Sequence, residues 1–273
     1  TKTPQGILLV MEQRSCEICE MLDLDAQGRK PLLMVLDNLQ DLNVTDVFYK
    51  GKLVDRNAPI RVKTCGRALK HTVHLDKVKA EQFVLPIGKK KTHVIGINPS
   101  QITTEDLAVS LQPAANYVPT DGYSKVAAVE RHHNTGKIGV AVAKGYGIRN
   151  GAVASSVSHD SHNIIVIGDN DRDMALAVDE IIRTQGGYTV VENGEVFETL
   201  PLPIMGLMSD AGFESVNETL GRMIKKAHEM GVPADIEPFI TLSFLALPVI
   251  PTLRITPRGL CLLTAKGPEI LQE

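Results

Sequence analysis

The spacing of apolar residues predicts a layered domain of strands and helices over residues 91–273. Six short apolar runs bounded by turn residues predict strands: 93–97, 125–130, 138–143, 164–167, 188–191 and 195–199. The last two flank Asn193-Gly194, a pair typical of tight hairpins. Two segments with apolar residues at helical spacing predict helices: 171–184 and 215–230. Strands that precede helices, together with a hairpin, favour a mixed α/β (α+β) fold over strictly alternating parallel strands.

The first third of the chain has a different pattern. Three short apolar runs predict a small antiparallel sheet within residues 1–60: 32–36, 44–49 and 52–54. Before them, the apolar spacing over 7–24 is closer to helical than to alternating. Residues 61–90 are polar, basic in part and interrupted by proline. They predict a connecting segment with one short strand near 83–85.

The composition argues against several classes of function. A formal charge of −3 over 273 residues gives no reason to expect a polyanionic partner, because nucleic-acid binders usually carry a basic face. No apolar run reaches the roughly 18 residues of a membrane helix, and the chain starts at Thr1 without a signal pattern, as a processed product or a fragment would. Four scattered cysteines indicate a reducing, cytoplasmic setting. Neither the Cys16/Cys19 pair nor the His71/His74 pair has further ligands at metal-binding spacing, so we predict no metal site.

Candidate chemistry is concentrated just before the fourth predicted strand, in the segment Ser158-His159-Asp160-Ser161-His162-Asn163. If this segment is extended, Asp160 and His162 share a face, whereas a helical turn brings His159 and His162 together. Either arrangement gives an imidazole a hydrogen-bonding partner, which suits proton transfer. We therefore take His159, Asp160 and His162 as candidate catalytic residues, and Ser158 and Asn163 as candidate substrate-binding residues. The alternative is a structural turn in which these side chains bond to the backbone.

A second polar segment ends the strand predicted at 125–130. On an extended chain Glu130 and His132 share one face, and Arg131 and His133 share the other. At most one of the two histidines is therefore expected to face a site shared with residues 158–163. All four are candidate substrate-binding residues, and the alternative is a solvated strand end.

Five segments, in this order and at these separations, resemble the carboxy-terminal domain of bacterial adenine deaminases, members of the amidohydrolase superfamily: 129–136, 144–156, 158–163, 200–210 and 241–251. The likeness is clear from about residue 91 to 258. It is weaker over 32–54, which resembles the end of the β-sandwich that flanks the amidohydrolase barrel. The resemblance implies a purine-salvage hydrolase that converts adenine and water to hypoxanthine and ammonia with a divalent metal, manganese or iron. Amidohydrolases bind that metal partly through a His-x-His pair, and this chain contains none.

The resemblance therefore implies a carboxy-terminal portion whose metal-bearing barrel lies outside this sequence. Alone, the chain is expected to be inactive and free of metal. The partners implied are adenine in the full-length context, the catalytic barrel as a domain or subunit, and further copies of the chain in a homo-oligomer. No nucleic-acid or membrane partner is expected. The alternative is a non-catalytic binding or subunit-assembly module, in which the apolar stretch 239–250 packs on another domain instead of inside the core.

Overall fold

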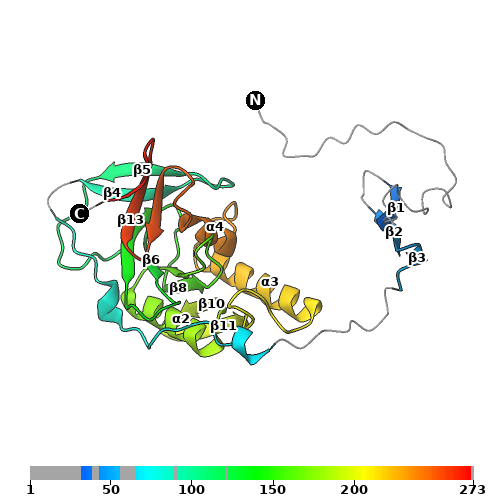
Figure 1. Ribbon diagram of the computed structural model, residues 1–273. Helices are drawn as coiled ribbons and strands as arrows, with labels where there is room; N and C mark the ends of the chain where they lie inside the picture. Colours follow the sequence, from blue (N-terminus) through cyan, green and yellow to red (C-terminus); the bar gives the residue numbers. More distant parts are fainter. Residues whose placement is uncertain (1–31, 39–42, 56–65, 89–90, 121, 272–273) are drawn as a thin grey trace. The chain divides into compact units, whose positions relative to one another are not determined.

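The computed structural model describes residues 32–38, 43–55, 66–88, 91–120 and 122–271 (Figure 1). Contacts between residues divide the chain into two compact units, 1–63 and 64–273. The helical spacing over 7–24 and the Cys16/Cys19 pair lie outside the described residues.

The first unit contains the antiparallel sheet expected from the sequence. Its strands, in spatial order, are β1 (Leu32–Asn38), β2 (Asn43–Tyr49) and β3 (Lys52–Leu53). Lys50 and Gly51 connect β2 to β3 at φ 52° and 71°. Positive φ at both central residues is typical of the tight turn whose twist matches the adjoining strands. The three predicted strands are confirmed.

An eight-stranded mixed sheet forms the centre of the second unit (Figure 1). In spatial order its strands are β11 (Glu195–Pro201), β10 (Gly187–Glu192), β8 (Gly151–Ser155), β9 (Ile164–Gly168), β6 (Tyr123–Val129), β7 (Ile138–Lys144), β4 (Thr92–Ile97) and β5 (Thr104–Val109). Neighbouring strands are antiparallel except β4 and β7, which are parallel. The predicted mixed α/β class is confirmed.

The apolar pattern misses two of these strands and misassigns one segment. β5 is an edge strand with two exposed polar residues in succession, and β8 consists of small residues that are all buried, so neither has the expected alternation. The strand predicted near 83–85 is wrong. Residues Ala80–Phe83 form the 3-10 helix η2, because the Gln82 side chain accepts a hydrogen bond from Lys79 N at 2.8 Å and stabilises a turn. A second short 3-10 helix, η1, spans Arg67–Leu69.

Three α-helices complete the second unit. α2 (Asp171–Thr184) has the predicted bounds, and the Asn170 side chain caps it by accepting a hydrogen bond from Asp173 N at 2.8 Å. α3 (Phe213–Glu229) begins two residues before the predicted start. α4 (Pro238–Leu245) overlaps the apolar stretch 239–250, for which the sequence predicted no helix.

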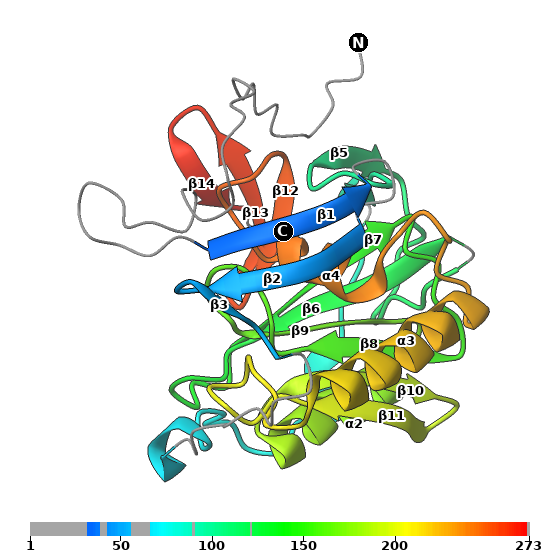
Figure 2. The ribbon, with the colours of Figure 1, turned by 90° about the vertical axis from the view of Figure 1, so that its right-hand side faces the viewer.

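The sheet is covered on both faces, which explains the uninterrupted apolar run of β9. Ile164 and Val166 belong to the core that α2 closes, whereas Ile165 and Ile167 belong to the core beneath α3 and α4. A second antiparallel sheet completes the α3/α4 layer (Figure 2): β12 (Leu253–Thr256), β13 (Gly259–Thr264) and β14 (Gly267–Ile270). Within the described residues, no helix has the length and apolar character needed to cross a membrane.

Candidate functional site at one edge of the sheet

The two polar segments singled out in the sequence meet at one edge of the eight-stranded sheet. Val129 at the end of β6 pairs with Ile164 at the start of β9, so the residues after β6 adjoin those before β9. Arg131 N donates to Asn163 Oδ1 at 3.3 Å. His132 Nε2 donates to the Ser161 carbonyl at 2.7 Å, because a carbonyl oxygen can only accept. The antiparallel pairing thus joins segments that lie about thirty residues apart.

Residues 158–163 form a turn, so the extended alternative does not apply. His162 N donates to the Ser158 carbonyl at 2.6 Å, and His162 has φ 49°. The turn brings the rings of His159 and His162 to a centroid distance of 6.2 Å. Asp160 is exposed and hydrogen-bonds to neither ring in the described part of the chain. No contact therefore supports Asp160 as the group that orients a histidine.

α4 supplies the contacts that orient His159. His159 Nδ1 shares a hydrogen bond with Ser243 Oγ, and His159 N donates to the Ser243 carbonyl at 3.0 Å. The next residue, Phe244, stacks on the imidazole with a centroid distance of 4.8 Å and an interplanar angle of 7°. Two consecutive residues of one helix therefore hold both the backbone and the ring of His159.

His162 is half-buried, and its Nδ1 has no hydrogen-bond partner among the described residues. Burial, followed by the nearby charge of Arg131, lowers the pKa of His162 below its ordinary value, although Asp160 acts in the opposite direction. A neutral imidazole at pH 7 keeps a nitrogen that can accept a proton. The adjacent Ser158 is fully buried, and its Oγ also lacks a partner within the described residues.

Arg131 holds the turn in place through backbone contacts. It is 2% exposed and donates through Nε to the His162 carbonyl, through Nη1 to Thr72 O at 3.1 Å and through Nη2 to Met205 O at 3.0 Å. Burial lowers the pKa of the guanidinium to about 10, so the group stays charged at neutral pH. Gly206 lies so close that a Cβ there would be 2.7 Å from Arg131 Nη1. These contacts give Arg131 a structural role.

Glu130 organises the turn after β6, so the predicted alternation of faces over residues 130–133 is wrong. Its carboxylate accepts hydrogen bonds from His132 N at 2.5 Å, His133 N at 3.0 Å and Thr135 N at 3.1 Å. Burial raises the pKa of Glu130, but the hydrogen bonds outweigh it, and the pKa lies below the ordinary value. His133 is exposed and lines, with Glu130 and Asn163, a hollow of about 410 Å³. Of the two adjacent histidines, only His132 contacts the turn.

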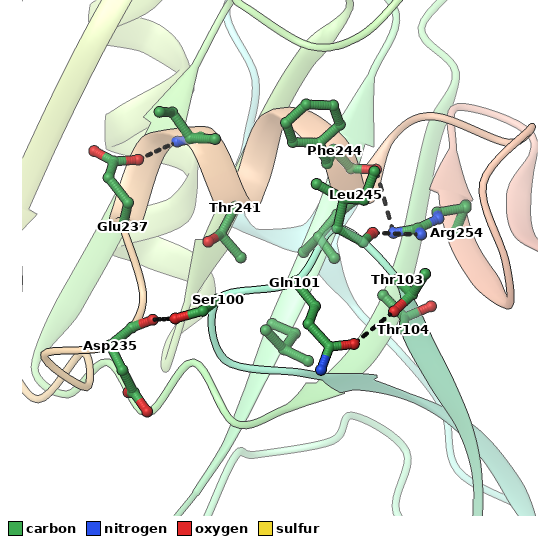
Figure 3. Close-up of a pocket in the computed structure, with 13 residues that line it drawn as sticks. Ser100, Gln101, Thr103, Thr104, Asp235, Glu237, Thr241, Phe244, Leu245 and Arg254 are labelled. Atoms are coloured by element: carbon green, nitrogen blue, oxygen red, sulfur yellow. Dashed lines mark hydrogen bonds between the residues drawn. The ribbon is translucent and has the colours of Figure 1, made fainter. Parts of the chain in front are cut away.

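A second hollow, of about 280 Å³, lies between the loop after β4 and α4 (Figure 3). Ser100 Oγ donates to the Asp235 carbonyl at 3.3 Å across one end of it. Phe244 lines this hollow and also stacks on His159, so α4 connects the hollow with the histidine pair. Buried Arg254 donates to the Phe244 carbonyl at 3.3 Å and fixes the end of the helix.

Ser243 and Phe244 are the site residues that the sequence reasoning missed. Ser243 is one of two hydroxyl residues in the otherwise apolar stretch 239–250, and that contrast is the signal that was available. Its partner His159 lies 84 residues away, so no local spacing could connect them.

The part of the chain that the structure describes contains no group of three His, Cys, Asp or Glu side chains placed to hold a metal ion. The histidines of the turn therefore do not fit the divalent metal that the family resemblance implies. Whether the whole chain binds metal stays a prediction.

Comparisons with known proteins identify one matching family and several relatives that share one name. Residues 101–266 match the family described as the adenine deaminase C-terminal domain. The chain is 48% identical over 237 residues to a protein named adenine deaminase from Desulfitobacterium hafniense, covering 86% of this chain and 42% of that protein. Adenine deaminases of Nitratidesulfovibrio vulgaris and Clostridium acetobutylicum are 44% and 38% identical, over 86% and 89% of this chain and 42% and 44% of their own lengths. The chain thus spans less than half the length of these relatives.

Proposed function

The chain belongs to the adenine deaminase C-terminal domain family, and we propose that it is the carboxy-terminal portion of an adenine deaminase, which converts adenine and water to hypoxanthine and ammonia. Two observations support this proposal. The relatives are named adenine deaminases, and the match covers only 42% of the length of the Desulfitobacterium hafniense protein. The divalent metal, manganese or iron, then belongs to the remaining part of the enzyme. The described residues offer no three-ligand group, and we derive no step of the reaction through the metal.

We further propose that the turn 158–163 faces the substrate-side opening of the full-length enzyme. The observation that carries this is the pair of imidazoles 6.2 Å apart at the edge of a rigid sheet. The ring of His159 is anchored by α4, and His162 is neutral with an unpartnered Nδ1. Departure of ammonia requires a proton on the leaving nitrogen, and imidazoles transfer protons near neutral pH. His159 and His162 are the proposed proton-transfer groups.

The remaining polar groups of the turn divide by their contacts. Ser158, whose buried hydroxyl has no described partner, and His132, which lies against the turn through the Ser161 carbonyl, remain the proposed residues for adenine positioning. Asn163 bonds to Arg131 N and to Ser161 Oγ and supports the turn. Asp160 is exposed, so it can contact substrate only from the solvent-exposed side of the turn.

Substitution in the full-length enzyme tests this proposal. His159→Ala and His162→Ala should each lower turnover by about 10²-fold or more, because a proton-transfer group contributes at least that much. The matched control is His71→Ala, which removes an exposed imidazole that belongs to neither polar segment and should leave turnover within about twofold. Ammonia release with hypoxanthine formation is the measurement. If both site variants keep near-normal turnover while their melting temperatures fall, the turn is structural.

The isolated chain should not deaminate adenine, even with added manganese, because the proposal places the metal elsewhere. We also propose a cytoplasmic purine-salvage role and a homo-oligomeric enzyme.

A non-catalytic assembly module is the second candidate function. Apolar residues exposed on and beside α4 favour it, since Ile240 is 57% and Val249 is 63% exposed. Metal-dependent turnover of the isolated chain, abolished by His159→Ala, would contradict both candidates.

A further inference from the structure

The position of Ser243 is set by the packing of α4. Ser243 is 3% exposed, and its neighbours Leu242 and Leu245 are buried in the core beneath the sheet. Pro238 and the capping side chain of Glu237 fix where the helix begins. A buried hydroxyl on an apolar helix is costly unless it has a hydrogen-bond partner, and the partner here is His159.

The contacts on His159 act on different parts of the residue. The Ser243 carbonyl accepts from His159 N at 3.0 Å and fixes the backbone, and Ser243 Oγ occupies the ring atom Nδ1. The Phe244 ring lies nearly parallel to the imidazole, at 7°, and limits its rotation. The other ring nitrogen, Nε2, has no hydrogen-bond partner among the described residues.

We propose that Ser243 is the positioning residue for His159: it occupies Nδ1, so that Nε2 is the nitrogen presented to substrate. This inference rests on the proposed function, because it assigns an orienting group to a histidine placed in the site by that proposal. A carboxylate commonly plays this part for a catalytic histidine, but Asp160, the nearest one in sequence, is exposed. A hydroxyl orients the ring without adding a negative charge beside it.

The three histidines that meet at this edge of the sheet, His132, His159 and His162, differ in which ring nitrogen forms a hydrogen bond. His132 uses Nε2 to bind the Ser161 carbonyl. His162 leaves Nδ1 buried without a partner in the described part of the chain. Only His159, of these three, combines a ring fixed at Nδ1 and by stacking with an uncommitted Nε2. It is therefore the histidine whose orientation an outside residue controls.

Long-range ¹H–¹⁵N spectra of the histidine rings in chain 1–273 test the positioning directly. Wild-type His159 should occupy a single tautomer at neutral pH, with its Nδ1 shift displaced by hydrogen bonding. Ser243→Ala should convert it to a tautomer mixture, whereas Ser243→Thr, which keeps the hydroxyl, should restore most of the wild-type pattern. The control is Thr241→Ala, which removes a hydroxyl of the same helix that lines the second hollow (Figure 3). A wild-type tautomer mixture, or unchanged His159 signals in Ser243→Ala, would overturn the proposal. If Ser243→Ala does not fold, the wild-type spectrum decides alone.

Kinetics of the full-length enzyme separate this inference from the proposed function. Ser243→Ala should lower kcat by about 10-fold or more with KM within about twofold, because misplacing a catalytic group affects turnover more than binding. Loss of turnover in His159→Ala but not in Ser243→Ala would overturn the positioning role and leave the proposed function standing. Normal turnover in His159→Ala, together with the tautomer change in Ser243→Ala, would refute the proposed role of His159 while Ser243 still orients the ring.

Discussion

Two buried arginines, Arg131 beside the turn 158–163 and Arg254 in β12, both donate hydrogen bonds to backbone carbonyls in different parts of the second unit. Arg131 is 2% and Arg254 1% exposed, and burial lowers the pKa of each guanidinium to about 10. Neither forms an ion pair with a carboxylate among the described residues. Arg254 instead donates to four carbonyls: Ile250 at 2.8 Å, Phe244 at 3.3 Å, Ile102 at 2.7 Å and Pro251 at 2.6 Å.

The comparison shows that a buried guanidinium beside candidate catalytic residues can have its donors taken up by backbone carbonyls. Arg131 fixes the backbone of His162, and Arg254 fixes the backbone of Phe244, which stacks on His159. Each arginine thus holds the chain next to one imidazole of the pair. The two arginines differ in their effect on a neighbouring pKa, since the charge of Arg131, in addition to burial, lowers the pKa of His162. Arg131 therefore holds the His162 backbone and also lowers the pKa of the His162 ring.

The largest expected effect comes from removing either guanidinium. Arg131→Met and Arg254→Met should each lower the free energy of unfolding by about 3 kcal/mol or more, because several buried carbonyls lose their donors. Urea unfolding curves measure this. Exposed Arg258 provides the control, and Arg258→Met should stay within about 0.5 kcal/mol of wild type. If Arg131→Met were as harmless as the control but abolished full-length activity, Arg131 would be a substrate ligand and the comparison would fail.

A smaller effect should follow from crowding Arg131 rather than removing it. Gly206 has φ 71°, and a Cβ there would lie 2.7 Å from Arg131 Nη1. Gly206→Ala should lower the free energy of unfolding by roughly 2–4 kcal/mol, from backbone strain plus displacement of the guanidinium. Gly122 isolates the strain, since it has φ 80° and a Cβ there would meet no atom within 4 Å. Equal losses in Gly206→Ala and Gly122→Ala would show that Arg131 can move freely.

Burial of His162, together with the nearby charge of Arg131, should also be visible in the pH dependence of stability. The pKa of His162 is depressed in the folded chain, so the unfolded chain takes up the proton first as the pH falls. The stability that neutral His162 contributes is therefore complete above its unfolded pKa of about 6.5 and is lost as the pH falls toward the folded pKa. Urea unfolding at pH 7 and pH 5 should show a smaller loss for His162→Gln than for wild type. A loss for His162→Gln as large as that of wild type would contradict this assignment.

The smallest expected effect is that of metal removal. With backbone contacts from two arginines holding the site, and with no three-ligand group in the described residues, a chelator should shift the melting temperature by less than about 1 °C. Elemental analysis of the dialysed chain should likewise find no stoichiometric manganese, iron or zinc. About one equivalent of metal, with a chelator-sensitive melting temperature, would mean that histidines of the turn bind an ion after all.

Much of the second unit could be predicted because local patterns decide it. The apolar face and the Asn170 cap determine α2, and Asn193-Gly194 determines the β10–β11 hairpin. The sequence did not predict β5 and β8, because an edge strand and a strand of small residues lack the usual alternation of apolar and polar residues. It did not predict α4, because a helix with apolar residues on nearly every side has no periodic apolar pattern.

The sequence by itself determined that residues 130–133 follow one strand and that residues 158–163 precede another, and it supplied the candidate proton-transfer residues. Only the tertiary structure decided how they meet: the antiparallel pairing of β6 with β9 places the segments together, and the packing of α4 puts Ser243 rather than Asp160 against His159. It also placed the Arg131 guanidinium against three backbone carbonyls. The physical reason is that strands and caps depend on neighbours in the chain, whereas an imidazole's partner depends on which distant side chain the core brings within hydrogen-bonding distance.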